Sequence, residues 1–156
     1  MMKVLGIDPG NYSTGFCVLS SQNSRFSIEK SGTIKSRKRP DNLKKIFISL
    51  QEVIDSFSPD EIALESAFYG KNPQSLIRLG EVRGIILLLS TLNGIPVYEY
   101  TPQKVKNSIT GYGWSKKEDV SFMVEKILGI KTESYDEADA VAVAFCHLQS
   151  RRLNIG

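Results

Sequence analysis

Residues that bind soft metals or form disulfides are scarce in this sequence, which has two cysteines and one histidine in 156 residues. So few soft ligands argue against a structural zinc site, because such sites usually take four cysteine or histidine side chains. Cys17 and Cys146 stand in apolar runs without metal-type spacing. We therefore expect two buried free thiols in a reducing compartment rather than a disulfide.

Long hydrophobic runs are also absent. No run approaches the roughly 18 apolar residues that cross a bilayer, and the longest candidate, Gly84–Leu92, contains Ser90 and Thr91. The chain opens with Met-Met-Lys and enters an apolar run at once, so no signal peptide is visible. These absences predict a protein with no membrane contact and a cytoplasmic location.

The sequence also lacks a large excess of charge of one sign. The net charge of +3 does not by itself indicate a nucleic-acid partner. Basic residues nevertheless gather in two clusters, each of which is also compatible with an ordinary solvated face. The first cluster consists of Lys35, Arg37, Lys38, Arg39, Lys44 and Lys45, and the second of Lys104, Lys106, Lys116 and Lys117.

Hydrophobic periodicity and turn residues predict a chain with both β-strands and α-helices. Three strands joined by short links favour an antiparallel meander, and later strands that alternate with helices favour a layered α/β fold with a mixed sheet. Without repeats or linkers, residues 1–156 are expected to form one domain. The predicted strands are Lys3–Asp8, Thr14–Ser20, Arg25–Ile34, Asp60–Glu65 and Pro96–Tyr100; the predicted helices are Pro40–Phe57, Pro73–Leu92, one beginning at Thr101-Pro102, Lys116–Leu128 and Asp136–Arg151.

Four acidic residues stand where this arrangement can bring them together. Asp8 ends the first strand and Glu65 the fourth, and parallel neighbours would place both at the edge where open α/β sheets carry their sites. Asp136 and Asp139 lie one helical turn apart, a rise of about 4.5 Å. Clustered carboxylates repel one another unless a hard divalent cation lies between them. Two such ions can support phosphodiester hydrolysis without a serine, cysteine or histidine nucleophile.

Each acid also has an alternative explanation. Asp8 in Asp-Pro-Gly is a typical turn residue, and Glu65 can be an exposed strand end. Asp136 with Asp139 fits a helix cap followed by an acid at the third position. His147 lies eleven residues after Asp136, about 16 Å along the helix, so we expect it to be a packed or surface residue rather than a metal ligand.

Five segments, spread from about residue 3 to residue 150, carry a familiar pattern. They are Leu5–Gly10 with Thr14–Gly15, Ala63–Glu65 followed by Phe68 and Lys71–Asn72, Leu79–Gly84, Tyr98–Lys106, and Asp136–Ala140. In this order and spacing they resemble the RuvC family of Holliday-junction resolvases. The Asp-Pro-Gly opening alone would be a weak signal, whereas the five segments in sequence are specific.

The resemblance implies a ribonuclease H-like fold, with a mixed five-stranded sheet flanked by helices. It implies a homodimeric endonuclease that resolves four-way DNA junctions by paired symmetric nicks, in recombination and repair. It further implies two Mg²⁺ ions per active site, with Mn²⁺ as an alternative, and a branch-migration complex of the RuvA and RuvB kind as partner.

The family's functional residues fall on defined positions of this sequence. Its catalytic acids fall on Asp8, Glu65, Asp136 and Asp139, its important basic residues on Lys106 and Lys117, and its base-wedging aromatic on Phe68. Some members carry histidine at the position of Asp136, so metal ligation there can differ in detail. We expect further DNA contacts from Tyr69, Lys71, Lys104 and Lys116, although surface lysines and packed aromatics remain alternative explanations.

Three other functions compete with this interpretation. One is a nuclease of the same fold that acts on RNA, as in the YqgF group. Another is a phosphate-binding module of the actin and sugar-kinase type, which generally needs two domains and therefore more than 156 residues. The third is an inert junction-binding protein, which four complete acidic positions argue against.

Gly80 and Gly84 permit close helix contact, either internal or with a second copy.

Overall fold

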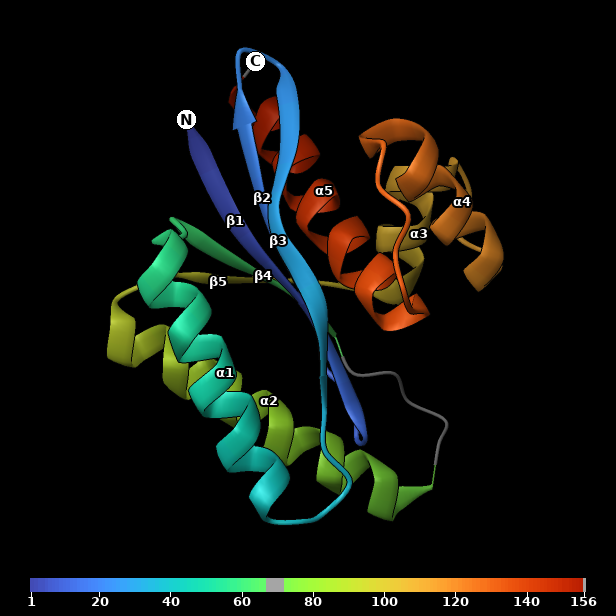
Figure 1. The fold of residues 1–156 in the computed structure, drawn as a ribbon. Helices are drawn as coiled ribbons and strands as arrows, with labels where there is room; N and C mark the ends of the chain where they lie inside the picture. Colours follow the sequence, from blue (N-terminus) through green and yellow to red (C-terminus); the bar gives the residue numbers. More distant parts are fainter. Residues whose placement is uncertain (67–71, 156) are drawn as a thin grey trace.

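The computed structural model describes residues 1–66 and 72–155, with side chains up to Arg151 in the second range. Five strands form one mixed sheet and five helices flank it (Figure 1), which confirms the predicted fold class. The strands are β1 (Met2–Asp8), β2 (Ser13–Gln22), β3 (Arg25–Lys35), β4 (Glu61–Glu65) and β5 (Val97–Tyr100); the helices are α1 (Asp41–Phe57), α2 (Pro73–Asn93), α3 (Pro102–Thr110), α4 (Lys117–Leu128) and α5 (Tyr135–Ile155).

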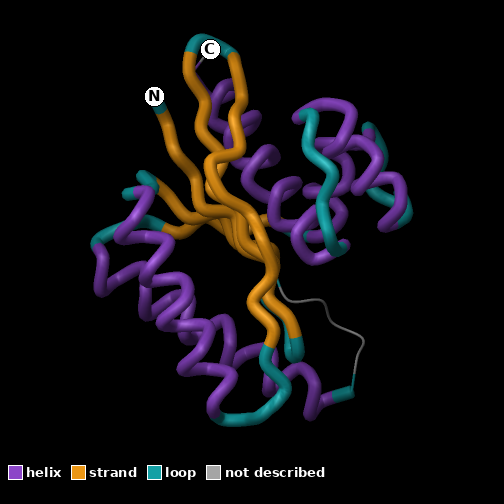
Figure 2. Tube along the Cα trace, viewed as in Figure 1, coloured by secondary structure: helices purple, strands orange, loops and turns teal. Residues whose placement is uncertain are grey.

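The sheet has the order β3-β2-β1-β4-β5, and Figure 2 shows its strands running between two groups of helices. Strands β1, β2 and β3 form the predicted antiparallel meander, whereas β4 runs parallel to β1, and β5 parallel to β4. Ile7 of β1 is paired with Leu64 of β4, and Asp8 and Glu65 are the next residues of the two strands. The parallel pairing therefore places both acids side by side at one end of the sheet.

Side chains along β1 and β4 point alternately to the two faces of the sheet, and each face is covered by a different group of helices. Leu5 and Ile7 belong to the core under α1 and α2, together with Ile62 and Leu64 of β4. Val4 of β1 and Ala63 of β4, which alternate with these residues, belong to the core under α5, α3 and α4. Because successive side chains point to opposite faces, the final acids of β1 and β4 lie on the α5 face.

Helix α5 packs closely on this face because two strand residues are glycines. A Cβ atom on Gly6 would meet the carbonyl oxygen of Ala140, and one on Gly15 would meet the carbonyl oxygen of Asp136. Gly15 is also the strand partner of Asp8. The missing side chains therefore let the first turn of α5 lie beside the end of β1.

A buried polar network ties α5 to the opposite end of β4. His147 Nε2 lies 2.7 Å from Glu61 Oε1, and its Nδ1 lies 2.5 Å from the hydroxyl of Tyr100. Arg151 Nε donates to Glu61 Oε1 at 3.0 Å and its Nη2 donates to Oε2; hydrogen bonding by this guanidinium is the main reason why the pKa of Glu61 lies below its ordinary value. His147 is therefore packed in the interior, as expected, where Glu61 and Tyr100 are its partners.

Several smaller predictions are also tested by the fold. Cys17 and Cys146 are buried free thiols, as expected. None of the described helices is both long and apolar enough to cross a membrane. Helix α1 begins at Asp41, so its predicted start at Pro40 is one residue too early. Pro40 takes the position before the helix, and its backbone carbonyl accepts a hydrogen bond from the amide of Leu43 at 3.0 Å.

Candidate active site

Three of the predicted acids converge where β1, β4 and α5 meet. Asp8, Glu65 and Asp139 each offer a carboxylate oxygen, and these oxygens all lie within 4.8 Å of one another. Asp8 and Glu65 come from parallel strands, and Asp139 lies in the first turns of α5. The turn and strand-end alternatives do not account for this convergence of three partly buried carboxylates.

Asp136 lies outside that group. Its Oδ2 accepts a hydrogen bond from the hydroxyl of Ser13 at the start of β2. Asp136 is not the helix cap either, because the Oγ of Ser134 accepts the hydrogen bond from the backbone amide of Glu137 at 3.0 Å. The charge of Asp136 still raises the pKa of Asp8, Glu65 and Asp139, so it belongs to the same electrostatic site.

Burial and mutual repulsion raise the pKa of all three converging acids. Burial is the largest cause for each; it raises the pKa of Glu65 to about 7 and that of Asp139 to about 6, with added repulsion from neighbouring carboxylates. The pKa of Asp8 is also raised well above its ordinary value, by burial and then by the charge of Glu65. Glu65 Oε2 is buried with no hydrogen-bond partner among the described residues. An unpartnered carboxylate oxygen among like charges fits a hard divalent cation.

These raised pKa values predict that the metal-free protein loses stability as pH rises from about 4, where the same carboxyls ionise in the unfolded chain, to about 6 to 7, where they ionise in the folded chain. Below that window the acids are protonated in both states. Within it the folded state keeps protons that the unfolded chain has already lost, and above it the folded state holds buried carboxylates that repel one another. Glu65→Gln should therefore stabilise the metal-free protein on the order of 2 kcal/mol at about pH 8, and much less at about pH 5. Urea unfolding in the presence of a chelator measures the stability difference at each pH.

The matched control for this prediction is Glu52→Gln, which alters an exposed carboxylate on α1. It should change stability little at either pH. Saturating Mg²⁺ should stabilise the unaltered protein at the higher pH and remove the advantage of Glu65→Gln. Equal stability of Glu65→Gln and the unaltered protein at the higher pH, without metal, would show that the carboxylates do not repel one another as described.

Two lysines supply positive charge next to the acids. Lys106 on α3 lowers the pKa of Glu65 and Asp139, and Lys117, the first residue of α4, lowers that of Asp139, although burial outweighs both effects. Neither lysine is within 4.0 Å of an acid among the described residues, which leaves their amino groups available for an anion. Lys104 and Lys116 are exposed nearby in sequence, and Lys104 lies 5.2 Å from the centre of the Tyr100 ring.

Sequence reasoning did not assign the residues that hold the acids in place. Arg83 of α2 donates to the backbone carbonyl of Glu65 at 3.3 Å and pairs with Glu99 of β5. The contact thus fixes the strand end that carries Glu65. Arg83 stands within a quoted family segment, but nothing in its local pattern indicates this partner. The predicted contacts Phe68, Tyr69 and Lys71 lie outside the described residues.

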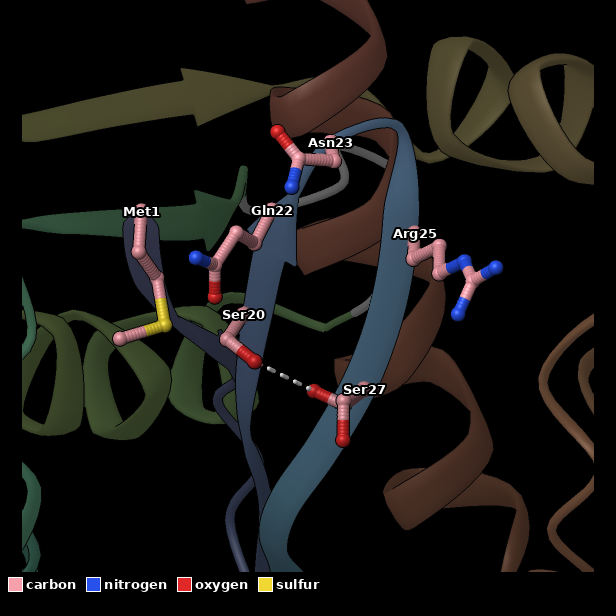
Figure 3. Close-up of a pocket in the computed structure, with 6 residues that line it drawn as sticks. All are labelled: Met1, Ser20, Gln22, Asn23, Arg25 and Ser27. Atoms are coloured by element: carbon pink, nitrogen blue, oxygen red, sulfur yellow. Dashed lines mark hydrogen bonds between the residues drawn. The ribbon is translucent and has the colours of Figure 1, made fainter.

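A hollow elsewhere on the molecule has a different chemistry. It lies at the β2–β3 hairpin, and the side chains that line it include no carboxylate (Figure 3). Ser20 Oγ donates to the carbonyl of Ser27 at 3.2 Å across it. The hairpin is at the end of β2 opposite to Gly15, the partner of Asp8. This hollow is therefore separate from the acidic site.

The acids at the ends of two parallel strands, with a third on the closing helix, define a nuclease of the ribonuclease H-like class. The chain belongs to the RuvC family, because the family model of crossover junction endodeoxyribonuclease RuvC matches residues 4–147. It is 42% identical to crossover junction endodeoxyribonuclease RuvC of Syntrophomonas wolfei, covering 98% of this chain and 92% of the relative. For the protein of the same name from Ehrlichia chaffeensis the identity is 42%, with coverages of 97% and 99%.

A solved structure agrees with the sequence comparison. RuvC of T. thermophilus, in complex with a Holliday junction substrate, superposes on this chain with a TM-score of 0.91 at 29% identity, covering 99% of this chain and 97% of the other. Matches of this extent to RuvC proteins do not favour the RNA-acting YqgF alternative.

Proposed function

We infer that this chain is a crossover junction endodeoxyribonuclease that resolves four-way DNA junctions in recombination and repair. The observation that carries the inference is the convergence of Asp8, Glu65 and Asp139 in a chain that matches RuvC over residues 4–147. In the presence of Mg²⁺ the protein should make paired, symmetric nicks in a synthetic four-way junction and leave a linear duplex of the same sequence intact. Equal cutting of the duplex would contradict junction selectivity.

Asp8, Glu65, Asp136 and Asp139 are proposed to hold two Mg²⁺ ions, or Mn²⁺, per active site. Such ions supply an activated water molecule and neutralise charge on the attacking and leaving oxygens of the phosphodiester. Three of the acids already share one site, and Ser13 holds the fourth carboxylate at its edge. The raised pKa values mean that metal binding must displace protons, so the affinity for Mg²⁺ should rise with pH.

Lys106 and Lys117 are proposed to place positive charge where negative charge develops on the scissile phosphate. Lys106→Ala should lower the single-turnover cleavage rate by about a hundredfold, the typical effect of losing one such group, with little change in fold. The matched control is Lys126→Ala. Nine residues beyond Lys117 on α4, Lys126 is about 13 Å away along the helix. An equal loss of cleavage rate in Lys106→Ala and Lys126→Ala would indicate a general effect of positive charge instead.

Further DNA contacts are proposed for Phe68, Tyr69, Lys71, Lys104 and Lys116, in addition to the two lysines above. The aromatic side chains suit stacking against bases that leave the duplex at the crossover. The lysines suit the DNA backbone, since most protein–DNA contacts are to phosphate and sugar. The T. thermophilus relative in complex with junction substrate supports this ligand for the present chain.

A homodimer is proposed, with α2 as part of its interface. Ile77, Leu88 and Leu92 are 66%, 47% and 63% exposed, and with Gly80 and Gly84 they lie along one side of the helix. An added Cβ on either glycine would meet no other described atom within 4 Å, so no described part of the chain covers this face at the two glycines. The protein should sediment at about twice the 17.4 kDa of one chain, and a monomer at micromolar concentration would oppose the proposal.

The cellular setting is proposed from the substrate. The nuclease would act in the cytoplasm, where bacterial DNA lies, on junctions presented by a complex of the RuvA and RuvB kind. Residues 1–156 are proposed to form one nuclease domain, since α5 contacts β1, β2, β3 and β4 as well as α3 and α4. One cooperative unfolding transition would support this unit.

A further inference from the structure

One aromatic side chain stands out by its exposure. Trp114 lies between α3 and α4 and is 89% exposed, more than any other large hydrophobic residue among those described. Tyr112 in the same segment is 50% exposed. An indole is costly to leave in water because of its large apolar area, and tryptophan is enriched at interfaces, where one part of the ring is apolar and its N–H is polar.

The segment that carries Trp114 is held in place on both sides. Thr110 Oγ1 donates to the carbonyl of Tyr112 at 2.9 Å, and Asp119 Oδ2 accepts from the backbone amide of Lys116 at 2.8 Å. Ser115, the next residue after Trp114, is buried. The backbone around the indole is therefore fixed while the ring itself projects into solvent, a preorganised arrangement that lowers the entropy cost of binding.

The surroundings of Trp114 are basic and connected to the acidic site. Lys116 and Lys117 follow it, and Lys106 precedes it on α3; none of the three is in an ion pair within the described part of the chain. Lys117 acts on the pKa of Asp139, so its charge reaches the active site. Three residues span at most about 11 Å, which places Trp114 within roughly three stacked nucleotides of a phosphate beside Lys117.

We propose that Trp114 is a stacking platform for a nucleobase of the DNA strand that passes the active site. The base would be one that the junction leaves unpaired or partly unstacked, because only such a base exposes its face. Lysines are depleted in the cores of protein–protein interfaces, whereas aromatics beside basic grooves are typical of single-strand binding. The proposal rests on the proposed junction nuclease activity and adds a base contact to it.

The test uses Trp114 itself, because it is the only tryptophan in the sequence. A synthetic four-way junction is titrated into the unaltered protein with a chelator present, so that binding occurs without cutting. Selectively excited tryptophan emission should fall in step with binding measured by gel shift, and the bound indole should be shielded from acrylamide. Trp114→Ala should weaken junction binding by about fivefold to a hundredfold, the equivalent of one base stack, and Trp114→Phe by less.

The matched control is Phe122→Ala, which removes another exposed aromatic, one that already has Lys126 5.9 Å from its ring centre. This variant should bind the junction as the unaltered protein does. If the junction is bound and cut normally but emission and acrylamide access do not change, Trp114 does not stack and only this inference fails. If Trp114→Ala and Phe122→Ala weaken binding equally, the contact is not specific and the inference again fails. If the unaltered protein does not act on junctions, the proposed function fails and the stacking role fails with it.

Discussion

Asp8→Asn should stop cleavage of a four-way junction while leaving junction binding almost unchanged. The amide keeps the shape of the side chain but loses the negative charge with which Asp8 is proposed to bind metal beside Glu65 and Asp139. Metal-ion stabilisation of the transition state is worth several kcal/mol, so the single-turnover rate should fall by roughly a thousandfold or more. Glu65→Gln and Asp139→Asn should behave in the same way, and Asp136→Asn should follow the same rule.

The control for this series is Asp55→Asn, which alters an exposed carboxylate on α1 that accepts a 2.9 Å hydrogen bond from Gln51. It should cut at the normal rate. Cleavage and binding are measured separately, in Mg²⁺ at neutral pH and in a chelator. Substantial cutting by Asp8→Asn would count against the whole acidic site, whereas loss of binding as well as cutting would point to misfolding.

Mixed dimers with one Asp8→Asn subunit should nick only one strand of each bound junction. One group of acids serves one strand, and resolution of a junction into two duplexes needs two matched cuts in strands of like polarity. A two-fold dimer presents two such groups, related by the same kind of axis that relates the two strands. The rate of the second nick should therefore fall by as much as the cleavage rate of the Asp8→Asn homodimer, on the order of a thousandfold.

This experiment needs purified mixed dimers under conditions that prevent subunit exchange and rebinding, with excess unlabelled junction as trap. The two strands carry different labels, so single and paired nicks are counted on the same molecule. Dimers with one Asp55→Asn subunit should cut both strands. Paired nicks from the Asp8→Asn mixed dimers would show that one subunit can serve both strands, and the two-site arrangement would be wrong.

The predicted elements agree closely with those of the structure, and the reason is local. Apolar periodicity, turns and caps act over a few residues, so β1, β4 and the helices appear in the sequence with boundaries correct to within a few residues. The misplaced features are also informative. The cap of α5 is Ser134 rather than Asp136, because the helix begins at Tyr135, two residues earlier than a cap at Asp136 implies.

The sequence by itself determined the class of protein, since the acidic residues and their flanking motifs are recognisable as ordered strings. It also placed Asp8 and Glu65 at strand ends. Only the tertiary structure decided that β4 lies parallel beside β1, and that glycines on β1 and β2 admit α5 closely enough to add Asp139. Only the tertiary structure turned Asp136 toward Ser13 and tied Arg83 to the end of β4. These arrangements join residues far apart in the chain, and they depend on packing between layers, which no local sequence pattern encodes.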